Sequence, residues 1–409
     1  MSPDRGPGAS SGDSPGASFW NRDFLLALTG YFFLYLAVSL FFLFPVVLER
    51  FGPSQSRIGL IMGIYSVVAI AVRPFFGHSI DVRGGRRFAV LGVLLLIATT
   101  PLFHLVHDAG WLPVLLRALA GLGWGVSMTA AISMCSDLGP VDRLAKSMGV
   151  IGVAGLVANA LGPLLAEELL RGGGPGRLYN ASLLFLAAAL ACFLAARELP
   201  RCEDGPAAGG AKALKAVPWA LALVIGAVPV FHGAIRGAMI FFIAVFANSI
   251  GLGRVGPFFV VFSLAAIVTR FHLGDVSDRR GRKAVILPAA LIIAFNLFAI
   301  AQVRSYPLLL VTGFVGGLGQ GLIFPALSTY IIDFLGRANK GLAISLYNSL
   351  FDVGMGLGAP FFGWISDLAG YRWMYRVAGL LLVVSTAVFM AKAPATEKQE
   401  GAEPLTRRA

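Results

Sequence analysis

The sequence has little charge for its length. Of its 409 residues only 13% are Asp, Glu, Lys or Arg, whereas 57% are hydrophobic and the mean hydropathy is +0.79. A soluble domain carries about 25% charged residues, so this chain has too few of them to present a solvated surface. The composition argues against a soluble globular protein and predicts a membrane protein.

Cysteine is also scarce, and the motifs of common catalytic and metal sites are missing. We expect the three cysteines, Cys135, Cys192 and Cys202, to be small hydrophobic residues without a disulfide. The sequence has no metal-spaced His or Cys cluster, no P-loop Gly-Lys-Ser/Thr and no Gly-x-Ser-x-Gly. We therefore expect no enzymatic activity, no cofactor and no bound metal. Without a P-loop, any transport would be driven by an ion gradient.

What the sequence does contain is a series of apolar runs. A run of about 20 residues spans a bilayer about 30 Å thick, and backbone groups in lipid must be bonded within their own helix. The runs are continuous, not alternating, which argues against a barrel. Twelve helices are predicted, at 24–47, 57–79, 88–106, 111–136, 147–169, 178–197, 218–246, 255–273, 284–302, 307–333, 341–366 and 374–391.

Positive charge predicts the orientation of these helices. With the N-terminus inside, 21 of the 33 Lys and Arg lie on the tails and even-numbered loops, and 8 lie on the other face. This asymmetry follows the positive-inside rule, so both termini are expected in the cytoplasm. The net charge of +12 then reflects the concentration of Lys and Arg on the cytoplasmic side of the membrane. Because the basic residues are scattered over short segments, nucleic-acid binding is not expected.

The predicted organisation has two halves. We expect a disordered cytoplasmic tail at 1–20, where Gly, Ser and Pro dominate and no cleaved signal peptide is seen. A six-helix bundle at 21–198 and a linker at 199–216 follow, then a second six-helix bundle at 217–392 and a cytoplasmic tail at 393–409.

An internal repeat relates the two halves. A constant offset of 197 residues takes Arg73 to Arg270, Gly77 to Gly274 and Asp81 to Asp278. The same offset takes Arg57 to Arg254, Gly59 to Gly256 and Pro163 to Pro360, and GLGWG (121–125) matches GLGQG (317–321) at an offset of 196. Six helices is an even number, so the repeats are parallel and are expected to enclose a cavity between them.

The loop after the eighth predicted helix, GDVSDRRGRK (274–283), resembles the loop signature of the major facilitator superfamily, G-x-x-x-D-R-x-G-R-R/K. The first-half copy, GHSIDVRGGRR (77–87), keeps part of it, and either Arg83 or Arg86 takes the basic role there. The resemblance covers all twelve helices and implies an all-α membrane protein with the major facilitator fold. It also implies a set of gating residues: Gly77, Asp81, Arg83, Arg86, Gly274, Asp278, Arg279, Arg282, Asp137 and Asp333.

By this resemblance, the loop charges latch the two halves together. Asp81 would touch the start of the eleventh helix and Asp278 the start of the fifth, when the cavity opens outward. Asp137 and Asp333, at the ends of the fourth and tenth helices, are candidate partners of the signature arginines. The alternative is that all these charges are solvated and only fix the topology.

Three further segments resemble parts of the family that export solutes. RALAGLGWG contains Arg117 and Gly121 in a pattern associated with proton coupling, and Gly162-Pro163 is similar to an element typical of antiporters. A bend or a packing notch is the plainer interpretation of that Gly-Pro. The segment 324–370 resembles the drug:proton antiporter and arabinose-efflux branch, and its deep acid is Asp352, about 16 Å into its helix.

Ionisable residues at this depth are costly and are candidates for function. Asp352 is the only acid predicted near a helix centre, and His232 and Arg236 lie four residues apart on one helical face. We expect Asp352 to pair with Arg236. Either Asp352 exchanges a proton during transport, or the pair is permanent. The predicted proton-coupling set also contains His232, Arg236 and Arg117. The alternative for His232 is a core hydrogen bond, for Arg236 the binding of an anionic group, and for Arg117 a side chain that extends to the membrane surface.

The predicted function is proton-coupled export of a small organic compound by alternating access, in the inner membrane and as a monomer in lipid. Substrate, protons and lipid are the expected partners. One alternative is an importer or exchanger of an organic anion, favoured by the buried Arg and His; another is a receptor or scaffold that transports nothing. Six polar or aromatic residues are expected to line the substrate cavity: Tyr31, Tyr35, Asn159, Gln320, Tyr347 and Asn348.

Overall fold

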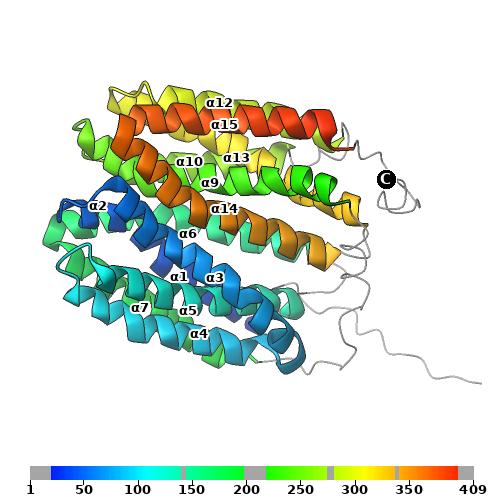
Figure 1. The fold of residues 1–409 in the computed structure, drawn as a ribbon. Coiled ribbons are helices and arrows are strands. Elements are labelled where there is room, and N and C mark those ends of the chain that lie inside the picture. Colours follow the sequence, from blue (N-terminus) through cyan, green and yellow to red (C-terminus); the bar gives the residue numbers. More distant parts are fainter. Residues whose placement is uncertain (1–19, 140–143, 198–217, 274–280, 337–339, 395–409) are drawn as a thin grey trace, which may run out of the picture.

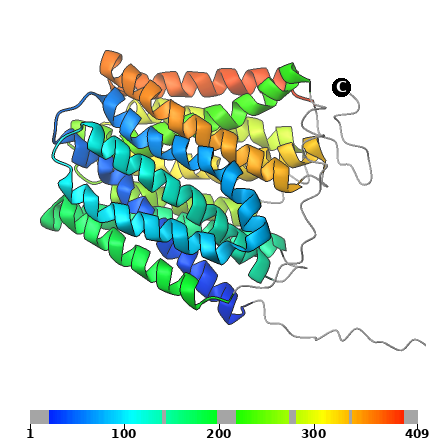
Figure 2. The ribbon, with the colours of Figure 1, turned by 60° about the horizontal axis from the view of Figure 1, so that its bottom comes forward.

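The structure is a computed structural model that describes residues 20–139, 144–197, 218–273, 281–336 and 340–394. Figure 1 shows a bundle of long helices that run side by side. The helix α1 begins and the helix α15 ends at the same end of the bundle, which we call the terminal end (Figures 1 and 2). The other end is the opposite end.

The first half of the chain forms seven α-helices and two 3₁₀ turns within the described residues. They are α1 (Arg22–Ser39), η1 (Leu40–Leu43), α2 (Phe44–Glu49), α3 (Gln55–Arg83), α4 (Gly85–Thr99), η2 (Thr100–Leu105), α5 (Trp111–Leu138), α6 (Leu144–Gly173) and α7 (Pro175–Ala195). The helices α3 and α4 pack on α5, and α1 packs on α6 and α7.

The second half of the described chain repeats this arrangement. Its helices are α9 (Trp219–Ser249), α10 (Gly256–Leu273), α12 (Arg282–Ile300), α13 (Tyr306–Leu335), α14 (Lys340–Ala369) and α15 (Tyr371–Lys392). The helices α10 and α12 pack on α13, and α14 packs on α9.

The predicted spans agree with these helices, with two local differences. The first span passes through η1 just before Pro45, and the third ends as an α-helix at Thr99 and continues as η2. The reason is proline: Pro45 and Pro101 cannot donate a backbone hydrogen bond, so they stand at the start of a new helical segment.

Eleven helical segments among the described residues are long and apolar enough to cross a membrane. The helix α14 spans 30 residues but is not in this set. It is the segment that holds Tyr347, Asn348 and Asp352. Its polar positions fit its place in the bundle, because α14 packs between α3 and α9 (Figure 1).

The backbone confirms the repeat at the start of α4 and α12. Gly84 and Gly281, which are 197 residues apart, both have φ of +89°. A side chain strains this left-handed region, whereas glycine enters it freely. The glycine of the loop signature therefore turns the chain sharply into the third helix of each half.

Candidate functional site

In the part of the chain that the structure describes, the halves meet mainly along two pairs of helices. We call α3 with α14 the first seam and α6 with α10 the second seam. Near the opposite end the first seam is very close: a Cβ on Gly59 would collide with the backbone of Ala359, and one on Gly63 with the carbonyl of Gly356. In the second seam, Gly256 lies in the same way against Leu164. Small residues thus let the halves meet backbone to backbone at this end.

A carboxylate from one half caps a helix of the other half in each seam. Asp367 accepts hydrogen bonds from the amides of Gln55 (2.6 Å) and Ser56 (2.8 Å) at the start of α3. Glu167 accepts from the amides of Val255 (3.0 Å) and Gly256 (2.5 Å) at the start of α10. The first-turn amides of a helix have no partner within the helix and face the positive end of its dipole, so a carboxylate stabilises them.

These two contacts, which we call the carboxylate caps, were not predicted from the sequence. Glu167 also pairs with Arg171 at 2.8 Å, and its side chain is buried. The signal in the sequence was Glu167 itself, a charged residue one turn after Pro163 within an apolar run. Because a buried acid needs a partner, such a residue predicts a contact, although it does not say with which helix.

The expected pairing of Asp352 with Arg236 is wrong. Asp352 on α14 forms an ion pair with Arg73 on α3, across the first seam. The side chains of Arg73 and Asp352 are 20% and 16% exposed. The reason is packing: α14 lies directly against α3, and a long arginine side chain reaches along the seam, whereas Arg236 on α9 turns towards α6 and α10.

The Arg73–Asp352 pair stands at a boundary in the first seam. Towards the opposite end the helices touch at Gly63 and Gly356. One turn beyond Arg73, towards the terminal end, a Cβ on Gly77 would meet no described atom within 4 Å. Among the described residues, the ion pair therefore lies where the close contact between α3 and α14 ends.

The second seam reaches a matching boundary at Arg270, the repeat partner of Arg73. A guanidinium nitrogen of Arg270 lies 3.2 Å from the place a Cβ on Gly152 would take. One turn earlier on α6, a Cβ on Gly149 would meet no described atom within 4 Å. The guanidinium also lies 5.5 Å from the ring of Phe324, and its buried Nε has no hydrogen-bond partner among the described residues.

His232 is hydrogen-bonded on both sides of its ring. Nε2 lies 2.9 Å from the Gln320 carbonyl oxygen, and Nδ1 lies 3.2 Å from the Tyr347 hydroxyl. The amide oxygen can only accept, so Nε2 donates and Nδ1 accepts from the tyrosine. A neutral imidazole satisfies both contacts. The structure thus brings together three residues that the sequence proposed for coupling or for the cavity.

Arg236 joins a second polar group. Its guanidinium lies 3.4 Å from the Asn159 amide oxygen and 4.4 Å from the centre of the Phe262 ring. Asn159 in turn donates to the Ser263 hydroxyl at 3.1 Å. Arg236 and Asn159 come from different halves, so this group also spans the second seam.

The two remaining tyrosines of the predicted cavity lie against α6. Tyr31 and Tyr35 have ring centres 6.1 Å apart, and both approach the place a Cβ on Gly155 would take. Tyr35 also meets Trp124 edge to face at 5.4 Å. Asn348 is half-buried on α14.

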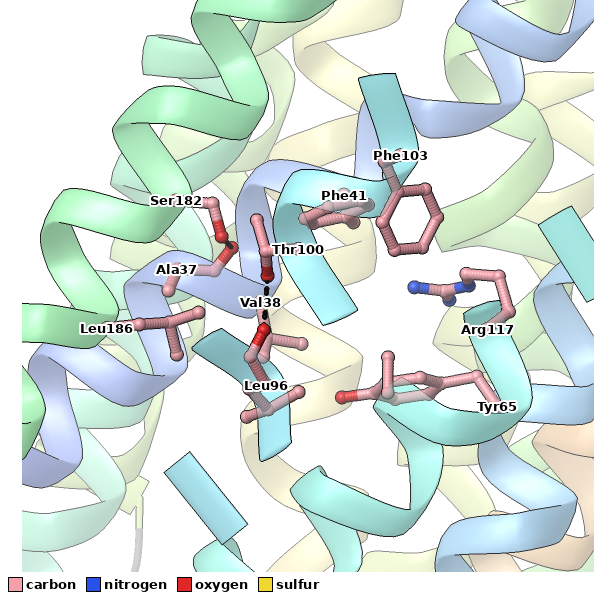
Figure 3. A pocket seen from close by; sticks show the side chains of 11 residues that line it. Ala37, Val38, Phe41, Tyr65, Leu96, Thr100, Phe103, Arg117, Ser182 and Leu186 are labelled. Atoms are coloured by element: carbon pink, nitrogen blue, oxygen red, sulfur yellow. Dashed lines mark hydrogen bonds between the residues drawn. The ribbon is translucent and has the colours of Figure 1, made fainter. Parts of the chain in front are cut away.

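Arg117 is buried inside the first half rather than extended to the surface. Its guanidinium lies 4.3 Å from the centre of the Tyr65 ring and 5.9 Å from that of Phe41 (Figure 3). A cavity of about 20 Å³ adjoins it, which is room for one water molecule. The Nε atom of Arg117 has no partner among the described residues, so a water here would satisfy it.

The loop signatures are described in part. Arg282 pairs with Asp333 at 2.8 Å. Arg86 donates to the carbonyls of Phe193 (3.1 Å) and Leu194, and Lys283, its repeat partner, donates to those of Met390 (3.1 Å) and Ala393.

Arg86 and Lys283 therefore bind the ends of α7 and α15, where a cation is favoured. Arg83 is exposed, Gly77 and Asp81 lie on α3, and Asp137 lies at the end of α5. Gly274, Asp278 and Arg279 lie outside the described residues. The expected latch through Asp81 and Asp278 stays a prediction. No cluster of three or more His, Cys, Asp or Glu that could hold a metal occurs in the described chain.

Known proteins match this chain over nearly its whole length. The family model described as Major Facilitator Superfamily matches residues 27–300 and again 230–408. The chain is 24% identical to the staphylopine export protein of Staphylococcus aureus, over 93% of this chain and 98% of that protein. It is 26% identical to the multidrug resistance protein MdtG of Citrobacter koseri, over 89% of this chain and 93% of that protein.

The fold has a close counterpart among solved structures. A bacterial homologue of the human lysosomal transporter Spinster, in an inward-facing and unoccupied conformation, superposes with a TM-score of 0.77. The match covers 92% of this chain and 97% of that one at 15% identity.

Proposed function

Because the chain belongs to the major facilitator superfamily, a family of multi-pass membrane transporters, we propose that it exports a small organic compound in exchange for protons. One relative that matches over most of its length is named an export protein and another a multidrug resistance protein, which supports the direction. We place the terminal end in the cytoplasm and the protein in the inner membrane, as the distribution of Lys and Arg predicts.

The ion pair between Arg73 and Asp352 is the observation on which proton coupling rests. It joins the two halves, it is the one acid–base pair deep in the described bundle, and it lies where the close glycine contacts of the first seam end. Protonation of Asp352 removes its charge and with it the attraction to Arg73. A proton at this position therefore acts directly on the contact between halves, as a coupling residue must.

The sequence of events follows from this placement. In the described conformation the opposite end is closed and Asp352 is paired, so the protein is ready to take substrate from the terminal end. After the halves rock, the site faces the other side, substrate leaves and Asp352 takes up a proton. With its charge removed, Asp352 releases Arg73 and the halves return. Loss of the proton to the cytoplasm then restores the pair.

The carboxylate caps supply the seal that this cycle needs. Glu167 and Asp367 hold the opposite end closed in the described conformation. Moving to the other conformation must break both caps, and we propose that Asp81 and Asp278 then bind the starts of α14 and α6. In this scheme His232 makes both of its hydrogen bonds as a neutral ring, so it positions Gln320 and Tyr347 and does not carry a proton.

Proton flux in proteoliposomes tests the proposal. The protein is reconstituted in known orientation with a pH-sensitive dye, and a panel of amines, sugars and carboxylates is added. We expect substrate-evoked proton flux from the wild type and from Asp352→Glu, which keeps an acid, and none from Asp352→Asn. Full gradient-driven transport by Asp352→Asn would refute the coupling role.

Exchange of organic anions is the second candidate function. The structure places Arg117, Arg236 and Arg270 inside the bundle, with Asp352 already paired to Arg73. Transport of a carboxylate without proton movement in the same assay would favour it, and would make the Arg73–Asp352 pair a structural contact.

A further inference from the structure

The repeat makes an asymmetry visible at the boundary of the two seams. Arg73 and Arg270 are repeat partners, and the offset of 197 residues takes Gly155 on α6 to Asp352 on α14. In the first seam the arginine therefore meets a carboxylate. In the second seam the equivalent position is a glycine, and the arginine lies against Gly152 one turn away.

Arg270 consequently has no acidic partner in the described bundle. It lies against Gly152 and the Phe324 ring, on which Tyr347 packs, and the phenol rings of Tyr31 and Tyr35 lie at Gly155, one turn along α6. None of these supplies a full negative charge, and the buried Nε makes no hydrogen bond among the described residues. A guanidinium at this depth costs several kcal/mol on most scales unless an anion accompanies it.

A second arginine faces the same stretch of α6. Arg236 contacts Asn159, which lies two turns, about 10 Å, from Gly152 on the same face of that helix. The two guanidinium groups are close enough to repel each other. Between them α6 presents Gly155, against which the hydroxyl of Tyr31 and the ring of Tyr35 lie.

We propose that the second seam holds an anion-binding site, in which the carboxylate of an organic anion supplies the partner that Arg270 lacks. Arg270 binds the carboxylate through paired N–H groups, a geometry suited to a planar guanidinium, and Arg236 adds a second positive charge. The phenol rings of Tyr31 and Tyr35 contact the body of the compound, which is aromatic or apolar. The proposal rests on the proposed function and specifies its substrate class.

Arg270 lies on the terminal-end side of the close Gly256–Leu164 contact in its seam, as Arg73 does relative to Gly63 and Gly356 in the first, so we place the entrance to the site at the terminal end. Bound anion and Asp352 then play equivalent parts: each neutralises one arginine at the boundary between the halves. When both are present, the step that carries substrate outward moves neither arginine without an anionic partner.

Gly152 allows a direct test, because the described structure leaves only Arg270 within 4 Å of an added Cβ there. Gly152→Asp places a carboxylate beside Arg270 and so occupies the site with an internal anion. Gly152→Asn has the same size without the charge and is the matched control. Arg270→Gln removes the cation itself.

The probes are two matched pairs, 3-phenylpropionate with 3-phenylpropionamide and indole-3-acetate with indole-3-acetamide. Binding to purified protein in nanodiscs, without any proton gradient, is measured by calorimetry and by the ligand-dependent shift of the thermal midpoint. We expect the wild type and Gly152→Asn to bind the acids and to bind the amides at least tenfold more weakly. We expect Gly152→Asp and Arg270→Gln to lose at least tenfold in affinity for the acids.

Equal affinity of Gly152→Asp and Gly152→Asn for the acids would overturn the proposal, as would absence of acid binding by the wild type. The result is separable from proton coupling. Proton-coupled export of amines with no binding of acids refutes the anion site and leaves the proposed function standing. Acid binding through Arg270 together with full transport by Asp352→Asn supports the anion site and refutes the coupling.

Discussion

The carboxylate caps predict how the balance between the two conformations can be shifted. Glu167→Gln keeps the shape of the side chain but removes its charge from two hydrogen bonds at the start of α10. A charged acceptor is worth about 1 kcal/mol more per bond than a neutral one, so the loss is about 2 kcal/mol. Asp367→Asn does the same at α3, but Asp367 is exposed and screened, so its loss is about 1 kcal/mol.

Together the two substitutions remove about 3 kcal/mol from the conformation closed at the opposite end, a shift of roughly 100-fold in the equilibrium. Opening the opposite end breaks both caps, so they stabilise only the conformation that is closed there. Removing them therefore raises the population of the conformation that is open at the opposite end. Glu167→Gln alone should shift the equilibrium by about 30-fold, and Asp367→Asn alone by about 5-fold.

Spin labels on introduced cysteines measure the shift, in a protein whose three native cysteines are replaced. One label pair, at His107 and Arg304, reports the separation of the halves at the opposite end, and another, at Arg197 and Lys392, reports the terminal end. We expect the double variant to lengthen the first distance and shorten the second. Glu168→Gln, an exposed neighbour, is the control. Distance distributions unchanged from this control would refute the sealing role of the caps.

Three further predictions concern the first seam and the His232 group. Gly63→Ala should push α3 from α14 and open the opposite end in the same distance measurement. Gly77→Ala should not, since no described atom lies within 4 Å of its added Cβ. Arg73→Gln should abolish substrate-evoked proton flux while keeping binding, and normal flux would contradict the role of its pair with Asp352. His232→Ala should lower the free energy of unfolding by about 2 kcal/mol, because its two buried partners Gln320 and Tyr347 lose hydrogen bonds, and it should retain proton flux. A thermal melt measures the first effect and the flux assay the second. Loss of flux in a folded variant would return His232 to the set of proton-coupling residues.

The membrane fold was predictable because its causes are local. Lipid removes water from the backbone, so each apolar run must close its own hydrogen bonds as a helix, and the run lengths give the spans directly. The repeat was visible for the same reason, since Gly84 and Gly281 are required by backbone conformation wherever the chain turns into α4 and α12.

The partners within the bundle were harder to predict. The sequence correctly singled out Asp352, His232, Arg236, Asn159, Gln320 and Tyr347 as polar residues in an apolar setting, and the structure places them in three connected groups. It gave the wrong partner to Asp352, because helical spacing relates residues on one helix and says nothing about which neighbouring helix lies opposite. Arg73 and Arg270 were recognised as repeat partners, yet their different environments were not.

The sequence by itself determined that this protein lies in a membrane, where its helices run, that its two halves are repeats, and which family it resembles. These follow from hydropathy, backbone chemistry and spacing, which act within a single segment of chain. Only the tertiary structure decided that Glu167 and Asp367 close one end, that Arg73 holds Asp352, and that Arg270 faces a glycine. Such contacts depend on which helices pack together and on the registers at which they cross, and these are set by close packing summed over the whole bundle.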